Sequence, residues 1–132
     1  MNVCVAPPAA PPPVPDGSFG SPARASRAAA DGSAIDITWD VATCSGGDYH
    51  VLYGPLSGVS TYAISGGVCD LGTSGSYSWT GVPAADLWYV VVSDDNASTE
   101  GNWGQATSGP MGGTSVSGQC SMSVRNNGGT CP

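Results

Sequence analysis

Lysine is absent from this chain, and basic side chains are few. The 132 residues include three arginines, one histidine and ten acidic residues, which gives a formal net charge of −7. Proteins bind the nucleic-acid backbone and anionic membranes through clustered Lys and Arg, so this deficit argues against both partners. An acidic surface of this kind mainly confers solubility.

Long hydrophobic runs are also missing. The longest one, residues 87–92, is far shorter than the roughly 20 apolar residues that cross a bilayer. The start of the chain, MNVCVAPPAAPPP, has neither the basic region nor the long apolar region of a signal peptide. Residues 24–30 are rich in alanine but too short to form a stable helix alone. We therefore expect neither membrane insertion nor a substantial helix.

The chain is rich instead in turn-forming residues that separate short apolar segments. Segments with alternating apolar positions recur about every 8–12 residues, which is the pattern of an antiparallel two-sheet β-sandwich and predicts an all-β fold. The expected strands are residues 23–28, 35–40, 49–53, 61–65, 76–81, 87–93 and 100–106.

Alternation within these segments predicts which side chains face the core. Two strands each carry three apolar residues on one face, namely Ile35, Ile37 and Trp39, and Tyr49, Val51 and Tyr53. Segment 87–93 is apolar on both faces, so we expect both of them to be covered. His50 points away from the Tyr49 face and is expected at the surface.

Composition divides the chain into three parts. Residues 1–21 are rich in Pro and Ala and favour an extended polyproline II spacer or a linker. Residues 22–107 hold the expected sandwich, and residues 108–132 form a tail rich in Gly and Ser. In that tail, Asn127-Gly128 is a strong signal for a tight hairpin turn. A lone hairpin is marginal in water, so we expect this one to be stapled or docked.

Three motifs in residues 22–107 occur in the order of a known domain family. They are Trp39 in IDITWD, Tyr-x-Val-x-Tyr at residues 49–53, and the corner GVPAADLWYVVV at residues 81–92. With these motifs the segment resembles the fibronectin type III domain. The corner departs from the family pattern, because it carries Trp88 followed by Tyr in place of a single tyrosine. The resemblance implies a seven-stranded sandwich used for protein contacts, for spacing, or as an accessory to carbohydrate-active enzymes.

Five cysteines in a small, strand-rich chain indicate an oxidising, extracellular or cell-surface setting. If successive strands alternate in direction, Cys44 and Cys69 lie in loops at the same end, which predicts a disulfide between them. Cys120 and Cys131 flank the expected hairpin, which predicts a second disulfide that staples it. Cys4 is then left over, either as a buried or free thiol or as a link between subunits.

Four oxygen-bearing residues cluster where a hairpin is expected, namely Asp94, Asp95, Asn96 and Glu100. Carboxylate and amide oxygens are the ligands that Ca²⁺ takes, although the spacing is not that of an EF-hand. Asp and Asn also favour plain turns, so both interpretations of the cluster remain open. No other cofactor is expected.

Aromatic residues supply the remaining candidate site. Large aromatic residues in a small domain usually fill its interior, so the tryptophans are expected in the core. Trp103 lies on the last expected strand, which is often a sheet edge, and is the tryptophan best placed to stack on a sugar instead. The chain contains no G-x-S-x-G elbow, and a surface His50 has no nucleophile beside it. The sequence therefore predicts a non-catalytic extracellular module with a structural or adhesive role, which contacts proteins and self-assembles through its N-terminal segment. The alternative is a carbohydrate-binding accessory module of a secreted enzyme.

Overall fold

The computed structural model describes residues 10–131 and consists mainly of short strands. The strands are β1 (Arg24–Arg27), β2 (Ile35–Thr38), β3 (Asp48–Pro55), β4 (Gly66–Val68), β5 (Ser76–Trp79), β6 (Leu87–Asp94), β7 (Thr99–Glu100), β8 (Gln105–Ala106), β9 (Gly109–Pro110) and β10 (Val124–Arg125). One 3₁₀ helix, η1 (Leu56–Thr61), follows β3. Within the described residues, no helix has the length and apolar character needed to span a bilayer.

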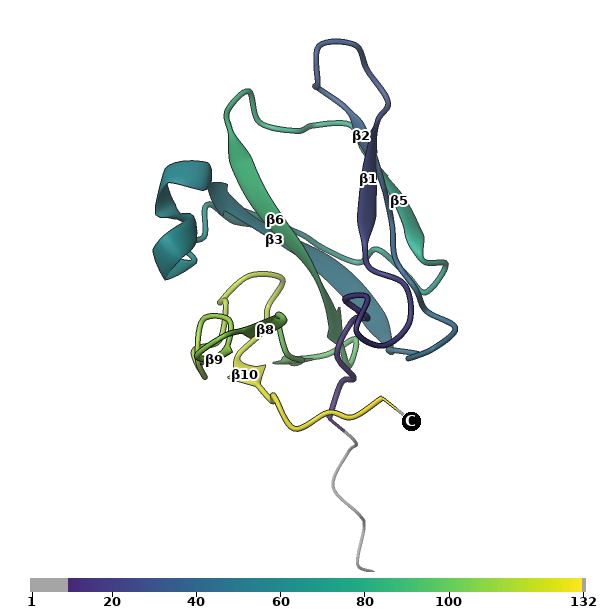
Figure 1. Ribbon diagram of the computed structural model, residues 1–132, viewed down its shortest axis with the longest axis vertical. Helices are drawn as coiled ribbons and strands as arrows, with labels where there is room; N and C mark the ends of the chain where they lie inside the picture. Colours follow the sequence, from purple (N-terminus) through teal and green to yellow (C-terminus); the bar gives the residue numbers. More distant parts are fainter. Residues whose placement is uncertain (1–9, 132) are drawn as a thin grey trace, which may run out of the picture.

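Two sheets face each other across a shared core (Figure 1). The smaller sheet has the strand order β1-β2-β5, and the larger has the order β10-β7-β6-β3-β4. The longest strands, β3 and β6, pair antiparallel from Asp48 opposite Asp94 to Pro55 opposite Leu87. β8 and β9 form a separate two-stranded ribbon. The chain is thus all-β, as its alternation predicts.

The alternating apolar residues build the core between the two sheets. Ile37 and Trp79 of the smaller sheet pack with Val51 and Val91 of the larger one, and all four are buried. The other predicted inward residues of β2 and β3 belong to the same cluster or pack against it. The faces expected from alternation are therefore confirmed for these strands.

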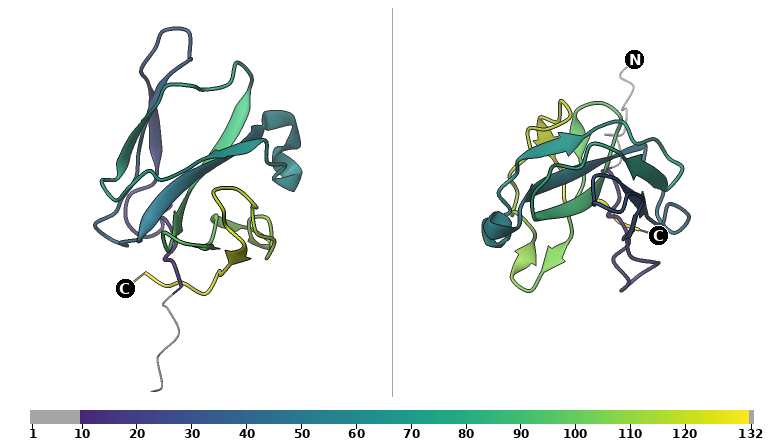
Figure 2. Two further views of the ribbon diagram at one scale, coloured as in Figure 1. Left: turned by 180° about the vertical axis from the view of Figure 1, so that it is seen from behind. Right: turned by 90° about the horizontal axis from the view of Figure 1, so that it is seen from above.

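β6 is covered on its second face as well, as its sequence predicts. Leu52, Trp88, Val92 and Trp103 form a separate buried cluster on that side, against which Met111 packs. Figure 2 shows the C-terminal region (green to yellow) lying on the side of β3 and β6 that faces away from β1 and β2. This second layer explains why β6 is apolar at almost every position instead of at alternate ones.

The connection after β3 differs from the expected strand over residues 61–65. The chain leaves β3 through η1, and Tyr62 ends that helix with a left-handed backbone (φ 52°). The edge strand then forms slightly later, at Gly66–Val68, and pairs antiparallel with β3.

The strand expected over residues 100–106 also fails to form as a continuous element. β7 comprises only Thr99–Glu100, and its single pairing with β6 joins Glu100 to Asp94. The chain then turns away from β6, with φ +127° at Gly104, and Gln105–Ala106 pairs with β9 instead. Glycine adopts such a backbone without strain, which permits the departure.

The proline-rich segment lies against its own domain over residues 10–15. Pro11 and Pro15 are buried, and the carbonyl of Pro12 accepts a hydrogen bond from the Ser93 hydroxyl. The carbonyl of Pro11 passes so close to Gly129 that a β-carbon there would collide with it. The described part of this segment is therefore packed between β6 and the tail. Residues 1–9, with Cys4, lie outside the described residues.

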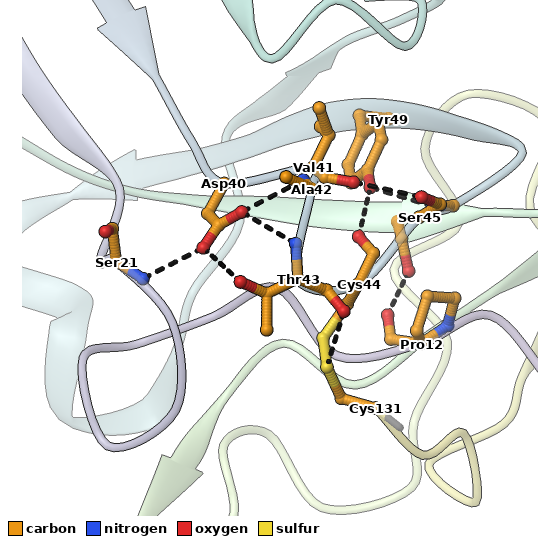
Figure 3. Close-up of a disulfide and its surroundings, with 12 residues drawn as sticks. Pro12, Ser21, Asp40, Val41, Ala42, Thr43, Cys44, Ser45, Tyr49 and Cys131 are labelled. Atoms are coloured by element: carbon orange, nitrogen blue, oxygen red, sulfur yellow. Dashed lines mark hydrogen bonds between the residues drawn. A yellow bond between two sulfur atoms is a disulfide. The ribbon is translucent and has the colours of Figure 1, made fainter.

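Both disulfides join the sheets to the C-terminal tail. Cys44 pairs with Cys131 and Cys69 with Cys120, with Cα atoms 5.3 and 5.4 Å apart, and Figure 3 shows the first of these bonds. The four cysteines are bonded as expected, but the predicted Cys44–Cys69 and Cys120–Cys131 partners are wrong. Cys44 precedes β3 and Cys69 follows β4, so both do lie at one end of the larger sheet. The tail crosses that end and bonds to each.

The loop that carries Cys44 is held in place by the carboxylate of Asp40 (Figure 3). It accepts the amides of Ala42 and Thr43 at 2.9 Å, the Thr43 hydroxyl at 2.6 Å and the Ser21 amide at 3.0 Å. These hydrogen bonds, above all the one from the Thr43 hydroxyl, lower the pKa of Asp40 to about 2. The loop is thereby tied to the chain that enters β1.

The expected hairpin between Cys120 and Cys131 does not form. β10 instead adds to the larger sheet, parallel to β7, with Val124 opposite Thr99. The turn signal at Asn127-Gly128 lies beyond this strand. The tail is therefore docked on the domain, which resolves the instability that a lone hairpin would have.

Candidate functional site

His50 is fully buried, contrary to the expected surface position. It lies on the face of β3 that also carries Leu52, and the C-terminal region covers this face. Its Nδ1 lies 2.6 Å from Oδ2 of Asp94, and its Nε2 lies 3.0 Å from Oε2 of Glu100. Both ring nitrogens are thus engaged by buried carboxylates, and neither faces solvent.

Glu100 connects this histidine to the C-terminal tail. Its Oε1 accepts the Ser117 amide at 2.6 Å, and its Oε2 accepts the Ser117 hydroxyl at 2.8 Å. Asp94 accepts the amide of Asn96 through Oδ1 at 2.8 Å. We call His50, Asp94, Glu100 and Ser117 the histidine network. It joins β3, β6, β7 and the tail on the second face of the larger sheet.

Opposite charges stabilise one another within the histidine network. Burial lowers the pKa of His50, but the hydrogen bonds and charges of Asp94 and Glu100 outweigh it and raise the pKa above its ordinary 6.5. Burial raises the pKa of Glu100, but the contacts with His50 and Ser117 outweigh it and leave the pKa below its ordinary 4.5. The charged forms of His50 and Glu100 therefore stabilise each other.

We expect the free energy of unfolding to be greatest in mildly acidic solution. The contribution of His50 is complete below its unfolded pKa of 6.5 and is lost as the pH rises through its raised folded pKa. The contribution of Glu100 is present above its unfolded pKa of 4.5 and is lost as the pH falls through its lowered folded pKa. Stability should thus decline on both sides of this window in denaturant titrations.

Two variants distinguish the pH dependence of stability that the histidine network causes from the pH dependence caused by surface groups. His50→Gln should remove the decline above pH 6.5. Asp36→Asn, which changes an exposed carboxylate of β2, should keep the decline on both sides. An alkaline decline of unchanged size in His50→Gln would contradict the role assigned to the imidazolium.

The residues considered for Ca²⁺ are not arranged around one point. Asp94 and Glu100 both point to His50, whereas Asp95 accepts two backbone amides within its own hairpin, at 2.9 and 3.0 Å. Asn96 lies at the exposed tip with φ 59°. Over residues 10–131, no three or more His, Cys, Asp or Glu side chains are placed to hold a metal ion. The geometry supports the turn interpretation of these residues.

Trp103 is only 6% exposed, so it is buried like the other tryptophans, and the alternative that it stacks on a sugar is wrong. Because the chain turns away after β7, the indole packs into the second cluster beside Trp88. The guanidinium of Arg125 covers the ring, 4.0 Å from its centroid. All four tryptophans lie between 5 and 7% exposed, and none forms an open platform.

Arg125 fastens the tail to this cluster through several contacts. Its Nε donates to Asn127 Oδ1 at 2.8 Å, and its Nη2 donates to the Met111 carbonyl at 2.5 Å. We expect Arg125→Met to lower the free energy of unfolding by about 1–3 kcal/mol, because the freed carbonyl stays partly buried. Trp103 fluorescence should shift to the red. Arg24→Met, an exposed change on β1, is the control and should do neither.

On the side of β6 where β7 pairs, the described part of the chain leaves the strand unpaired from its start up to the short contact with β7. The Ser93 carbonyl accepts the Gly101 amide at 2.8 Å on the β7 side, so alternation directs the N–H and C=O groups of Tyr89 and Val91 to that same side. Within residues 10–131 these groups have no backbone partner there, since β7 pairs only with Asp94. We call this stretch, residues 89–91, the open edge.

A cavity of about 380 Å³ lies along the open edge. Its apolar lining comes from the N-terminal segment, the start of β1 and the C-terminal region, namely Val14, Pro15, Pro22, Ala23, Trp103 and Met111. It lies where a continuous strand over residues 100–106 would have paired with β6. Sequence reasoning missed the open edge because the segment EGNWGQA reads as a strand.

Comparisons of the chain with protein-family models, curated proteins and solved structures give no match. Two disulfides indicate an oxidising compartment, and one buried histidine is enclosed by carboxylates. Among residues 10–131, one central strand has backbone groups without a backbone partner.

Proposed function

We propose that the protein is a non-catalytic extracellular module that makes structural or adhesive protein–protein contacts through the open edge. The unpaired N–H and C=O groups of Tyr89 and Val91, beside an apolar cavity, carry this proposal. An exposed sheet edge is a template on which an extended strand of another protein can pair. Buried backbone groups are nearly always hydrogen-bonded, so a partner that covers this edge has to pair with the amides and carbonyls of Tyr89 and Val91.

The strand order supports a fibronectin type III-like sandwich as the scaffold. Strands β1 to β7 divide into β1-β2-β5 and β4-β3-β6-β7, a division into three and four that suits the seven-stranded sandwich implied by the sequence resemblance. In this proposal the seventh strand is shortened to two residues, and a docked tail follows it. The shortening is what leaves the open edge.

The histidine network supports a structural role. A general acid or base must come within hydrogen-bonding distance of its substrate, directly or through one water. His50 is 0% exposed, and each of its ring nitrogens is bonded to a carboxylate. The disulfides support the extracellular setting, because such bonds persist mainly in oxidising compartments.

Selection from a peptide display library on the full chain tests this function. We expect the selected peptides to carry apolar residues at alternate positions and to slow amide exchange at Tyr89 and Val91. N-methylation of alternate peptide amides should abolish binding for one set and spare the other, because only one set faces β6. Binding that tolerates both sets would contradict strand pairing. Binding to polysaccharides on a glycan array, with no peptide selected, would contradict the proposed function.

A further inference from the structure

We infer that the strand completing the open edge is supplied by residues 2–6 of a second copy of this chain. This inference rests on the proposed function, because it names the occupant of the same site. The occupant has to be extended, has to offer amide and carbonyl groups to Tyr89 and Val91, and has to present apolar side chains to the cavity.

The sequence of residues 2–6, Asn-Val-Cys-Val-Ala, meets these requirements. Val3 and Val5 alternate, so they would share one face of a strand, and β-branched residues favour strands. Pro7 and Pro8 follow and have no amide hydrogen, so strand pairing would end there. Five residues span about 16 Å at about 3.3 Å each, which is enough to pass both unpaired residues of β6.

Charge permits this segment to approach a strongly acidic protein. The formal net charge is −7, yet no side chain from residue 2 to residue 15 is charged. Asp16 is the only charged residue among those that line the cavity. Docking residues 2–6 there would bury apolar atoms without bringing like charges together, which is a usual obstacle to association of acidic chains.

The smaller sheet leaves space for an added strand. Ala25 of β1 lies opposite Ile37 in the β1–β2 register, so the two side chains share a face. Ile37 is fully buried, whereas Ala25 is exposed. Ala23, two residues earlier on the same face, lines the cavity. The small, exposed side chain of Ala25 on the inner side of β1 is consistent with a missing neighbour, whereas Ala23 already packs against the core.

The position of residues 10–15 favours a donor from another copy. Pro12 is bonded to Ser93, at the β7 end of the open edge, and Val14 already lines the cavity. To reach its own open edge, residues 2–6 would have to reverse direction through Pro7 and Pro8. Consecutive prolines favour extended backbone, which opposes such a reversal.

This contact is head-to-tail, because the donor segment and the acceptor edge are different surfaces of the chain. Heterologous contacts of this kind produce rings or open filaments, whereas self-complementary surfaces close as dimers. We therefore expect association to continue beyond the dimer as the protein concentration rises.

The experiment uses the full chain with Cys4→Ser, so that no disulfide between copies contributes. Light scattering should show a mass that increases with protein concentration. Amide exchange at Tyr89 and Val91, followed by NMR, should slow over the same concentration range. Exchange in the centre of β3 should not change, because that strand is already paired on both sides.

Two double variants of residues 2–6 provide the matched comparison. Val3→Asp with Val5→Asp places two charges on the face that enters the cavity and should weaken association by at least about tenfold. Asn2→Asp with Ala6→Asp adds the same charge on the opposite face and should retain most of the association. Equal loss in both variants would show that charge alone is responsible and would overturn the inference.

Three further outcomes separate the inference from the proposed function. Association without slower exchange at Tyr89 and Val91 overturns the inference. Slow amide exchange at Tyr89 and Val91 in protein of monomer mass would mean that residues 2–6 pair with the open edge of their own chain. That result also overturns the inference. If displayed peptides bind at the open edge while the full chain stays monomeric with fast exchange, the occupant is wrong and the proposed function stands. If no displayed peptide binds either, both are wrong.

Discussion

Glu100→Ala should lower the free energy of unfolding by about 3–5 kcal/mol, the usual cost of removing one partner from a buried charged pair. The substitution leaves the His50 imidazolium buried with a single carboxylate. It also leaves the Ser117 amide and hydroxyl without the oxygens that they now contact at 2.6 and 2.8 Å. The loss should be measured by denaturant unfolding within the mildly acidic window, where His50 and Glu100 both contribute to stability.

Glu100→Gln separates the charge from the shape of this side chain. The amide keeps an oxygen for Ser117 but removes the negative charge beside His50, so its cost should be smaller than that of Glu100→Ala. Asp36→Asn, at an exposed carboxylate, should cost less than about 0.5 kcal/mol. A cost for Glu100→Ala no greater than that of Asp36→Asn would show that the network does not stabilise the fold.

Removing the Cys44–Cys131 disulfide should have an effect of similar size. The bond joins residues 87 positions apart, and loss of the corresponding restriction on the unfolded chain amounts to about 4.5 kcal/mol. For Cys69–Cys120, with a separation of 51, the same relation gives about 4 kcal/mol. Paired Cys→Ala variants should therefore unfold at clearly lower denaturant concentrations than the parent, the first pair at the lowest.

Thiol counting tests the partners independently of stability. Replacing Cys44 and Cys69 together removes one half of each observed disulfide, so Cys120 and Cys131 should both become free thiols. If those two were bonded to each other, the same variant would gain none. Mass analysis of thiol-alkylated protein without reduction distinguishes the two results, and a variant that gains no thiol would contradict the observed partners.

Alternation predicted the core because it depends only on neighbours in the chain. The same pattern of apolar residues also indicates that His50 is buried. Segment 87–93 is apolar on both faces, which indicates a covered second face, and His50 lies opposite Val92 in the β3–β6 register. A residue on a covered face cannot be at the surface. The predicted surface position of His50 is wrong because the covered second face expected for β6 also extends over the neighbouring strand β3.

Other features depend on contacts that are distant in sequence. Four cysteines allow three sets of partners, and choosing among them requires the path of the tail, including the parallel pairing of Val124 with Thr99. The short length of β7 could not be predicted from the sequence for a different reason. Its sequence favours a strand, but glycine at 104 permits the turn away from β6, and that turn buries Trp103 instead of exposing it.

The cross-link at Cys44 has a mechanical consequence if the protein connects its neighbours as proposed. The described chain enters and leaves at the same end, where Pro11 lies against Gly129. A pulling force applied at residue 10 and at Cys131 passes through the Cys44–Cys131 bond, so the ring formed by residues 44–131 carries no tension. Only residues 10–43 can be drawn out, which limits the extension to about 110 Å at about 3.3 Å per residue. Under load, β1 and β2 would peel away first, while β3, β6 and the histidine network would stay folded.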